Sequence, residues 1–451
     1  MYPDKNKFRV KRMKVKMIVA AVAVAGLTAT AANAADNGKL QLQISQLKAQ
    51  QTQLQQQVAN LQGQGQTTGA VHVGAVGGEL ISENNYDGRG LDLLKSLAKA
   101  GSNAPLLTIG GTLEADAQMN RNGNVGSGST SGDPSGLNYT DGTSSSAFYL
   151  DTARIDILAH INDWVNGEIA YDLNGDSGLH TGSLLVGNLN QLPVYGQIGK
   201  FYPDAGLFEL ASDDVYSASL VKRYFRPDAQ NGASVGFYKA GLHTSLTAFK
   251  TSTEQSNVAN YNQATSDWSA QADYTFNAGQ VNATIGAGYL SNMVNTNDSF
   301  TATGAGTGSQ KDRLPMANVS AKIGFGPFEA LATYAQTLKG LANTTGGGTT
   351  KLKAFDLEGA YHFQAVKPMT VMLGYSRTYG FDKVGPVDQF IDGNTVTTIN
   401  NKKDQWLLGV NSEVFKNTTV GLEYARVGQL DSTGTDTNRY NVLTADMTVK
   451  F

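Results

Sequence analysis

The strongest constraint on the fold is a two-residue alternation of apolar and polar side chains that recurs from Leu107 to the last residue. In the stretch LTIGGTLEADAQM, residues 107–119, aliphatic residues occupy one set of alternate positions, and Thr, Glu, Asp and Gln occupy the other. Successive side chains of a β-strand point to opposite faces of the sheet, so each such stretch predicts a strand with one apolar face. The alternation returns around Ile157, Ala272 and Leu357. A sheet with lipid on one side and water on the other has this pattern.

The composition agrees with such a sheet and argues against other classes of protein. Charged residues make up 16% of the 451 residues, below the roughly one quarter of an ordinary globular protein, and the net charge is only −3. Nucleic-acid-binding domains are basic as a rule, so no nucleic-acid partner is expected. The chain has no cysteine, which excludes disulfide bonds and thiolate metal ligands. A soluble sandwich also alternates, but aromatic residues near strand ends favour the girdles of a membrane barrel.

The first residues of the chain predict an export signal. Residues 1–16 contain seven Lys and Arg, an apolar run of about 14 residues follows, and Ala-Asn-Ala at 32–34 has the small-residue pattern of a cleavage site. The run is short for a membrane-spanning helix, which needs about 20 apolar residues. We therefore expect residues 1–34 to be a signal peptide that starts at Met1 or Met13. The rest would reach the bacterial outer membrane, with its N-terminal region in the periplasm.

Residues 35–62 predict a short coiled-coil helix in the periplasm. Apolar residues and one glutamine repeat at the a and d positions of about three heptads in a Gln-rich segment. A helix of this length is marginal by itself, so it needs partner helices or another surface, and a homotrimer is the assembly we expect. A solvated, partly helical spacer is the alternative. The expected oligomerisation positions are Leu40, Ile44, Leu47, Gln51, Leu54, Val58 and Leu61.

Residues 63–105 predict a linker, rich in Gly and Thr, with one short amphipathic helix. The stretch LDLLKSLAKAG, residues 91–101, has helical periodicity, and Gly101 suits the position after a helix end. We expect this helix to lie at the mouth of a barrel that comprises residues 106–451.

Counting predicted strands from the far end of the chain indicates the topology. The stretch NVLTADMTVKF alternates up to Phe451, in the manner of the C-terminal signal by which the barrel assembly machinery recognises its substrates. Bacterial single-chain barrels have an even number of strands, with short periplasmic turns and longer external loops. The predicted turns obey this rule only if residues 204–230 form a single connection. The expected fold is therefore all-β, an antiparallel transmembrane β-barrel of about sixteen strands in contact with outer-membrane lipid.

The connection 204–230 is too aliphatic and aromatic to be simply solvated, so we expect it to fold into the lumen. Opposed charges at a constriction create a transverse field that orients polar solutes, and aromatic rings stack on flat parts of a ligand. Alternatively, the cations of this connection pair with carboxylates of the wall and only set the pore width. The candidate pore-lining residues are Arg154 on the second strand, Glu209, Asp213 and Asp214 on one limb, and Lys222, Arg223, Tyr224 and Arg226 on the other, with Phe225 as a further stacking ring.

Two weaker motifs do not point to other chemistry. GASVG at 232–236 fits a nucleophile elbow, but Ser234 lies inside a predicted strand rather than at a strand-to-helix turn, so we expect no enzyme activity. DLNGDSG at 172–178 begins like a calcium loop, but serines occupy two of the required positions. The five histidines show no ligand spacing, so we predict neither a metal site nor a cofactor.

Two segments resemble a known family. Residues 150–172 and 184–208, together with the heptad helix and ENNYDGRGLDLLKSLAK before the barrel, are similar to the LbtU-like siderophore porins, the family typified by the legiobactin receptor. The resemblance implies a sixteen-stranded outer-membrane barrel with a periplasmic coiled coil. It also implies uptake of a ferric siderophore without a large plug domain.

Other functions fit the same residues. A general porin for small solutes, or one selective for anions or sugars, needs the same barrel, and a structural or adhesive barrel is a third possibility. The small polar residues of the stretch 122–145 weigh against adhesion. The chain is too short for a plugged receptor of about 22 strands, whereas sixteen strands can enclose an aqueous channel.

Overall fold

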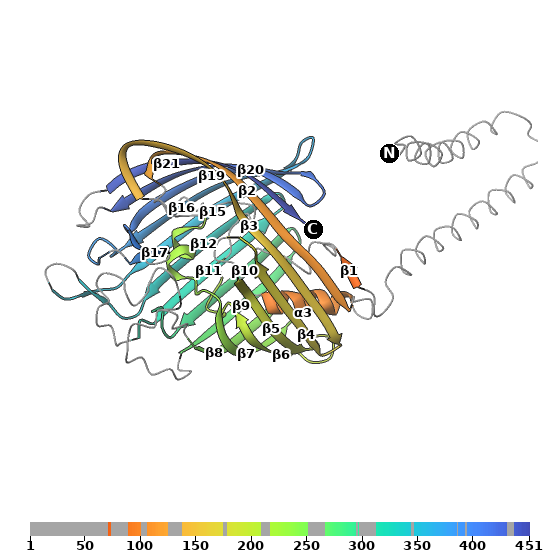
Figure 1. Ribbon diagram of the computed structural model, residues 1–451. Helices are drawn as coiled ribbons and strands as arrows, with labels where there is room; N and C mark the ends of the chain where they lie inside the picture. The colour runs from red at the N-terminus through yellow and green to blue at the C-terminus, as the bar shows by residue number, and fades with distance from the viewer. Residues whose placement is uncertain are drawn as a thin grey trace, which may run out of the picture. The chain divides into compact units, whose positions relative to one another are not determined.

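The computed structural model describes residues 71–73, 89–100 and 106–451, apart from internal gaps (Figure 1). The gaps are residues 125–137, 175–177, 209–216, 251–266, 295, 297–312, 344–346, 386, 393–394 and 431–436. All described residues belong to the second of two compact units of the chain, Thr68–Phe451. The predicted signal peptide, 1–34, and coiled-coil helix, 35–62, lie outside the described residues, and both stay predictions.

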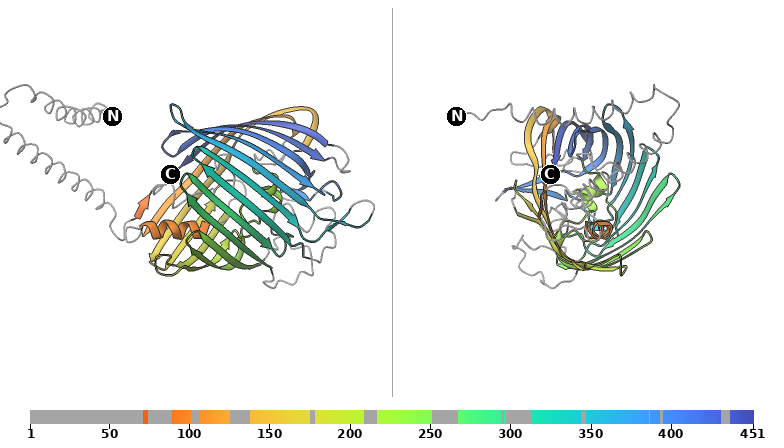
Figure 2. Two further views of the ribbon diagram at one scale, coloured as in Figure 1. Left: turned by 180° about the vertical axis from the view of Figure 1, so that it is seen from behind. Right: turned by 90° about the vertical axis from the view of Figure 1, so that its right-hand side faces the viewer.

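Sixteen antiparallel strands form a closed barrel, as the alternation and the turn parity predict (Figures 1 and 2). Neighbouring strands pair in chain order, and β2 closes the barrel by pairing with both β3 and β21. The barrel strands are β2 (Leu107–Asn124), β3 (Asn138–Asn162), β4 (Val165–Asp172), β5 (Gly178–Gly187), β6 (Val194–Phe201), β7 (Gln230–Lys239), β8 (Leu242–Lys250), β9 (Asp267–Ala278), β10 (Val281–Leu290), β11 (Met316–Phe325), β12 (Phe328–Thr337), β15 (Lys353–Gln364), β16 (Pro368–Tyr379), β19 (Lys402–Phe415), β20 (Thr418–Leu430) and β21 (Thr437–Lys450).

The remaining elements are short. β1 (Val71–Val73) adds in parallel to the edge of β2, and two hairpins lie in long connections, β13 (Leu341–Ala342) with β14 (Thr349–Thr350) and β17 (Asp388–Asp392) with β18 (Thr395–Ile399). Two helices, α3 (Arg89–Ala100) and α4 (Leu220–Phe225), lie inside the ring of strands, as the right-hand view of Figure 2 shows. No described helix is both long and apolar enough to cross a membrane.

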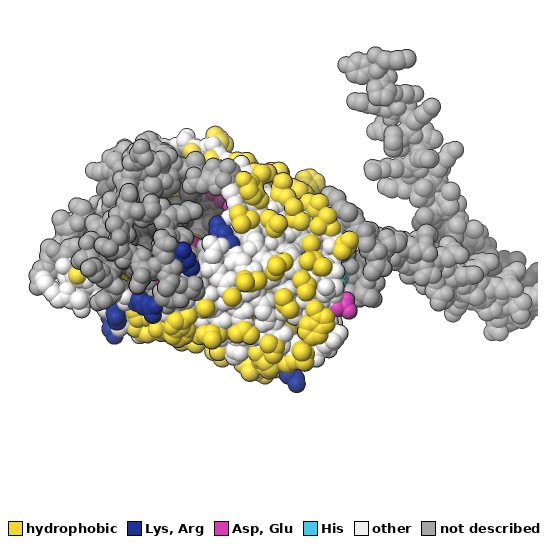
Figure 3. Space-filling view, turned by 60° about the horizontal axis from the view of Figure 1, so that its bottom comes forward, with side chains coloured by type: hydrophobic (Ala, Val, Ile, Leu, Met, Phe, Trp, Pro, Cys, Tyr) yellow, Lys and Arg dark blue, Asp and Glu magenta, His cyan; other side chains and the backbone are white. Residues whose placement is uncertain are grey.

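The two faces of the strands follow the predicted alternation. On β15, Leu357 is 52% exposed and Tyr361 is also exposed, whereas Asp356 and Glu358, on either side of Leu357, are buried. The exposed positions point away from the barrel and form an apolar outer surface, one side of which is seen in Figure 3. The buried positions point into the lumen. An apolar exterior around a polar interior is the arrangement of a transmembrane barrel.

Phe451 lies at the seam where the barrel closes. Its amide and carbonyl groups exchange hydrogen bonds with the backbone of Gly111 on β2 (3.0 and 2.9 Å). The ring lies beside this glycine and is 44% exposed. The last residue therefore completes the pairing of β21 with β2, and its predicted role as an assembly signal stays a prediction.

Candidate functional site in the barrel lumen

The described parts of the connection between β6 and β7, residues 202–208 and 217–229, lie inside the barrel and are here called the crossing segment (Figure 2). Its first limb lies against β9 and β11. The Gly206 amide donates a hydrogen bond to Gln271 Oε1 (2.9 Å), and Ser320 Oγ donates one to the Leu207 carbonyl oxygen (2.8 Å). These partners are 65 and 113 positions apart in the chain. The inward fold of this segment is thus held by side chains of the wall itself.

The second limb contains α4, which contacts β12, β15, β16 and β19. The helix begins at Ser219, whose hydroxyl oxygen accepts a hydrogen bond from the Lys222 amide (3.2 Å), as an N-cap residue does. The Leu220 amide donates a hydrogen bond to Ser376 Oγ on β16 (3.2 Å). The crossing segment is therefore attached to the wall at two separate places, β9–β11 and β12–β19.

The structure overturns the predicted ligand-stacking role of Tyr224 and Phe225, since both side chains are fully buried. The ring of Tyr224 lies 4.6 Å from that of Phe381 between centroids, and its hydroxyl oxygen accepts a hydrogen bond from the Lys402 amide (2.9 Å). The cause is helical spacing: Leu220, Val221, Tyr224 and Phe225 lie on one face, which packs into an apolar cluster with residues of neighbouring connections. Tyr224 is not a pore-lining residue.

Lys222 and Arg223 lie on the other face of α4. Both are half-buried, and both interact with other groups of the chain. Because the apolar face of α4 packs toward β12–β19, these two side chains start from the face of the helix that is turned away from that wall. Their predicted acidic partners, Glu209, Asp213 and Asp214, lie outside the described residues.

The two other predicted cations belong to one network at the wall. Arg154 Nε on β3 pairs with Asp172 Oδ1 on β4 (2.6 Å), and Asp172 Oδ2 lies 2.8 Å from His180 Nδ1 on β5. His180 Nε2 lies 3.1 Å from the Tyr202 hydroxyl, and the Arg226 guanidinium lies over the Tyr202 ring, 5.0 Å from its centroid. Arg154 points inward as predicted but is almost fully buried. The network joins both ends of the crossing segment to the wall.

Buried carboxylates line the lumen side of β2, β3, β4 and β20. Glu168 on β4 accepts a hydrogen bond from Thr181 Oγ1 (3.2 Å), and Glu423 on β20 accepts one from the Ser217 amide of the crossing segment (3.1 Å). The buried, inward-pointing carboxylates of this part of the wall are Asp116, Asp156, Glu168 and Glu423. Sequence reasoning did not select them, although the alternation places Asp116 and Asp156 on the polar face. These strands are thus acidic on the lumen side, whereas α4 carries the cations Lys222 and Arg223.

Three carboxylates of this wall lie especially close together. Oxygens of Glu114, Asp116 and Asp151 are within 4.8 Å of one another, a separation at which they could share a cation. Glu114 also accepts a hydrogen bond from Thr152 Oγ1 (3.1 Å). Ser234 of the elbow-like motif lies within β7, where Thr247 Oγ1 donates a hydrogen bond to its hydroxyl oxygen (3.0 Å).

The helix α3 fills one side of the lumen at the end with the short turns. Leu91, Leu93, Leu94 and Leu97 pack on inward-pointing apolar residues of β3, β5 and β6, which are Leu158, Leu185 and Tyr195. The Asn190 side-chain amide, in the turn between β5 and β6, donates a hydrogen bond to the Ala98 carbonyl oxygen (2.9 Å). The predicted amphipathic helix therefore lies within the barrel mouth, packed on an apolar surface of the wall.

The opposite side of the same mouth holds a polar cleft. The cleft has a volume of about 440 Å³ and lies among β15, β16, β19 and β20. Its lining includes His362, Thr370, Asn411 and Glu413, and His362 Nδ1 lies 3.0 Å from Thr370 Oγ1. The mouth is therefore apolar and filled on the α3 side, and polar on the side of the cleft.

Comparison with known sequences identifies one distant relative. A UPF0422 protein of Coxiella burnetii is 24% identical over 289 residues, which are 60% of this chain and 57% of that protein. The chain thus matches a little over half the length of this relative. No family model matches the chain.

Comparison with solved structures identifies the fold. An anion-selective porin from Comamonas acidovorans aligns with a TM-score of 0.50 and 10% identity, covering 76% of this chain and 99% of that one. A loop-deletion mutant of OmpT, an outer membrane protein of Vibrio cholerae, aligns over the same shares with a TM-score of 0.46 and 13% identity. At such identities, the likeness to the anion-selective porin shows the barrel fold alone.

Proposed function

We propose that the protein is an outer-membrane porin in which small polar solutes pass between the crossing segment and the barrel wall. The observation that carries this proposal is the placement of Lys222 and Arg223 on the polar face of α4, within a barrel whose inward-pointing carboxylates include Asp116, Asp156 and Glu168. A segment of this kind narrows a wide barrel, and the opposed charges act on polar solutes in the gap. The similar fold of a porin described as anion-selective supports the same function.

We further propose that the solute is a ferric siderophore. The resemblance of residues 150–172 and 184–208 to siderophore porins supports this choice. Hydroxycarboxylate siderophores carry negative charge, and guanidinium groups bind carboxylates through paired hydrogen bonds. A general porin, or one selective for anions or sugars, is the second candidate. The pairing of Arg154 with Asp172 favours it, because a cation held by the wall sets the pore width rather than binding a solute.

Planar-bilayer recording of the purified protein tests both levels of the proposal. Heat-modifiable migration on gels first establishes that the sample is folded. A folded protein without conductance would rule out a porin of either kind and leave a structural or adhesive barrel. Channels that a ferric hydroxycarboxylate siderophore blocks, and that its iron-free form and a neutral sugar do not, are the expected result. Channels indifferent to the ferric complex would contradict the siderophore and leave the porin standing.

We also propose that the chain is exported by residues 1–34 and trimerises through residues 35–62 in the periplasm. The basic and apolar pattern of the first segment and the heptads of the second support these proposals. Cross-linking in membranes, with and without residues 35–62, tests the second. Equal trimer yield from both forms would assign assembly to the barrel instead.

A further inference from the structure

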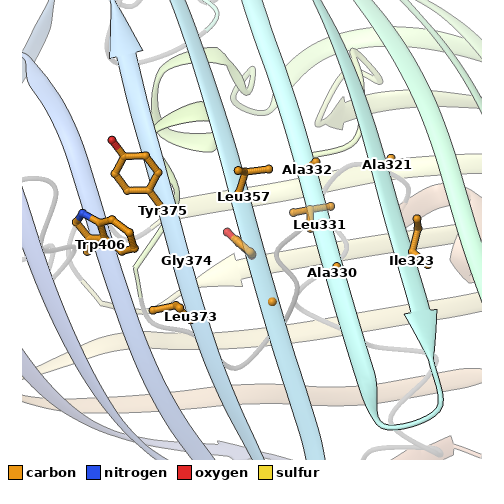
Figure 4. A pocket seen from close by; sticks show the side chains of 12 residues that line it. Ala321, Ile323, Ala330, Leu331, Ala332, Leu357, Leu373, Gly374, Tyr375 and Trp406 are labelled. Carbon is orange, nitrogen blue, oxygen red and sulfur yellow. The ribbon is translucent and has the colours of Figure 1, made fainter.

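An apolar groove runs over the lipid-facing side of β11, β12, β15, β16 and β19 (Figure 4). It has a volume of about 430 Å³. The small side chains of Ala330 and Ala332 give it depth, and the larger Leu373, Tyr375 and Trp406 bound it. Tyr375 and Trp406 lie side by side, with ring centroids 4.4 Å apart. Aromatic pairs of this kind are typical of the level at which lipid headgroups meet acyl chains.

Three cations lie at the end of this groove that is nearer the long loops. Arg377 is two residues beyond Tyr375 on β16, and Arg426 on β20 is directly paired with Trp406. Lys353 on β15 is paired with Tyr379, at the same end of the sheet. Each cation shares the strand phase of outward residues such as Leu357, Tyr375 and Tyr424, so its side chain starts on the lipid-facing side.

Among the described residues, no acidic side chain lies within salt-bridge distance of these cations. Within the part of the chain that the structure describes, Lys353, Arg377 and Arg426 form no salt bridge. The Arg377 guanidinium lies over the Tyr379 ring, 5.3 Å from its centroid, and its Nε has no hydrogen-bond partner among the described residues. Asp404, which is opposite Arg377 in the β16–β19 pairing, is already bound by Arg439 (2.7 Å).

We propose that this face binds a phosphate-bearing lipid of the outer leaflet, with an acyl chain in the groove and a phosphate held by Arg377, Arg426 and Lys353. The groove supplies apolar contact in the bilayer, and the cations supply charge complementarity at its boundary. Guanidinium groups bind phosphate through paired hydrogen bonds, and three cations together favour a headgroup with net negative phosphate charge over a zwitterionic one. The site lies on the outside of the barrel, so it is independent of the proposed passage of solutes through the lumen.

Native mass spectrometry of the purified full-length protein with added lipid A tests the charged part of the site. Arg377→Glu with Arg426→Glu should weaken lipid A binding by tenfold or more. The matched control is Lys239→Glu with Lys416→Glu, two exposed lysines at the short-turn end, and it should bind as the wild type does. Arg377→Gln with Arg426→Gln removes the charge without adding repulsion and should still weaken binding. Unchanged binding by either arginine pair, or an equal loss in the control, would overturn the proposal.

Two further arms test the groove and the phosphate. Ala332→Trp fills the groove without changing the charge, so it should reduce lipid A binding several-fold. Lipid A stripped of its phosphates should bind to the wild type about as weakly as intact lipid A binds to the arginine variants. If the dephosphorylated lipid binds as tightly as intact lipid A, the proposed phosphate contact is wrong. If the Ala332→Trp variant binds lipid A as the wild type does, the proposed acyl chain in the groove is wrong. Heat-modifiable migration verifies that each variant is folded.

Discussion

The guanidinium of Arg226 lies over the ring of Tyr202, 5.0 Å from the ring centroid, and this contact joins the two ends of the crossing segment. Tyr202 follows β6, and Arg226 follows α4 shortly before β7 begins. The Tyr202 hydroxyl also lies 3.1 Å from His180 Nε2 on β5. The base of the segment is therefore a closed loop attached to the wall, which limits how far the segment can swing across the lumen.

Arg226→Ala should loosen this base and increase the single-channel conductance and its noise. A cation–π contact is worth about 0.5–2 kcal/mol, enough to let the segment sample open positions without unfolding the barrel. Single-channel recording at fixed voltage measures both quantities. Tyr202→Phe is the matched control, because it keeps the ring under Arg226 and removes only the hydroxyl contact with His180. A quiet, wild-type current from Arg226→Ala would show that the base of the segment is held by other contacts.

Lys222→Glu together with Arg223→Glu should shift the ion selectivity toward cations by several-fold. The change replaces the positive face of α4 with negative charge in a lumen whose wall already carries Asp116, Asp156 and Glu168. Reversal potentials in a salt gradient give the permeability ratio. Lys239→Glu with Lys416→Glu, outside the lumen, makes the same charge change and should leave the ratio unaltered. If both pairs give the wild-type ratio, Lys222 and Arg223 do not line the conducting path.

Tyr224 contributes to the stability of the crossing segment and not to solute binding. Tyr224→Phe removes one buried hydrogen bond to the Lys402 amide and should lower the free energy of unfolding by about 1 kcal/mol. Tyr224→Ala also removes the ring that packs on Phe381, so about 3–5 kcal/mol is expected. Urea titration of the barrel in lipid vesicles measures both values. A Tyr224→Phe variant with normal stability, but with a changed block of the channel current by the siderophore, would instead show that Tyr224 lines the pore.

Leu94→Asp should displace α3 from the barrel wall and widen the mouth of the barrel at the short-turn end. A carboxylate on the apolar surface of Leu158, Leu185 and Tyr195 lacks a partner, and its burial is costly. Conductance should therefore rise relative to the wild type. Lys99→Asp places the same group on an exposed position of α3 and should have no such effect. Equal conductance in all three proteins would mean that α3 does not obstruct the path of ions.

The barrel wall follows from local information. The alternation around Leu357 and Asp356 repeats every two residues, and the geometry of a strand converts that period directly into an outer and an inner face. The strand count and the placement of the crossing segment follow as well, because a barrel closes only with a consistent alternation of short and long connections. Neither inference requires knowing which strands face each other across the lumen.

The contents of the lumen depend on contacts between residues that are far apart in the chain. The residues 222–227, KRYFRP, give no sign of which side of the short helix faces the wall. Tyr224 is buried because its ring packs on Phe381 and its hydroxyl accepts a hydrogen bond from the Lys402 amide. Arg154 is recognisable as an inward cation, but its pairing with Asp172 requires the register of β3 against β4.

The sequence by itself therefore determined the barrel, its faces, its number of strands and the position of the long connection between β6 and β7. Only the tertiary structure decided which charged side chains are paired inside the lumen, which part of the wall α3 packs on and where the outer face has a groove. The physical reason is range: alternation acts between neighbouring residues along one strand, whereas burial and ion pairing depend on elements that the closed sheet brings together.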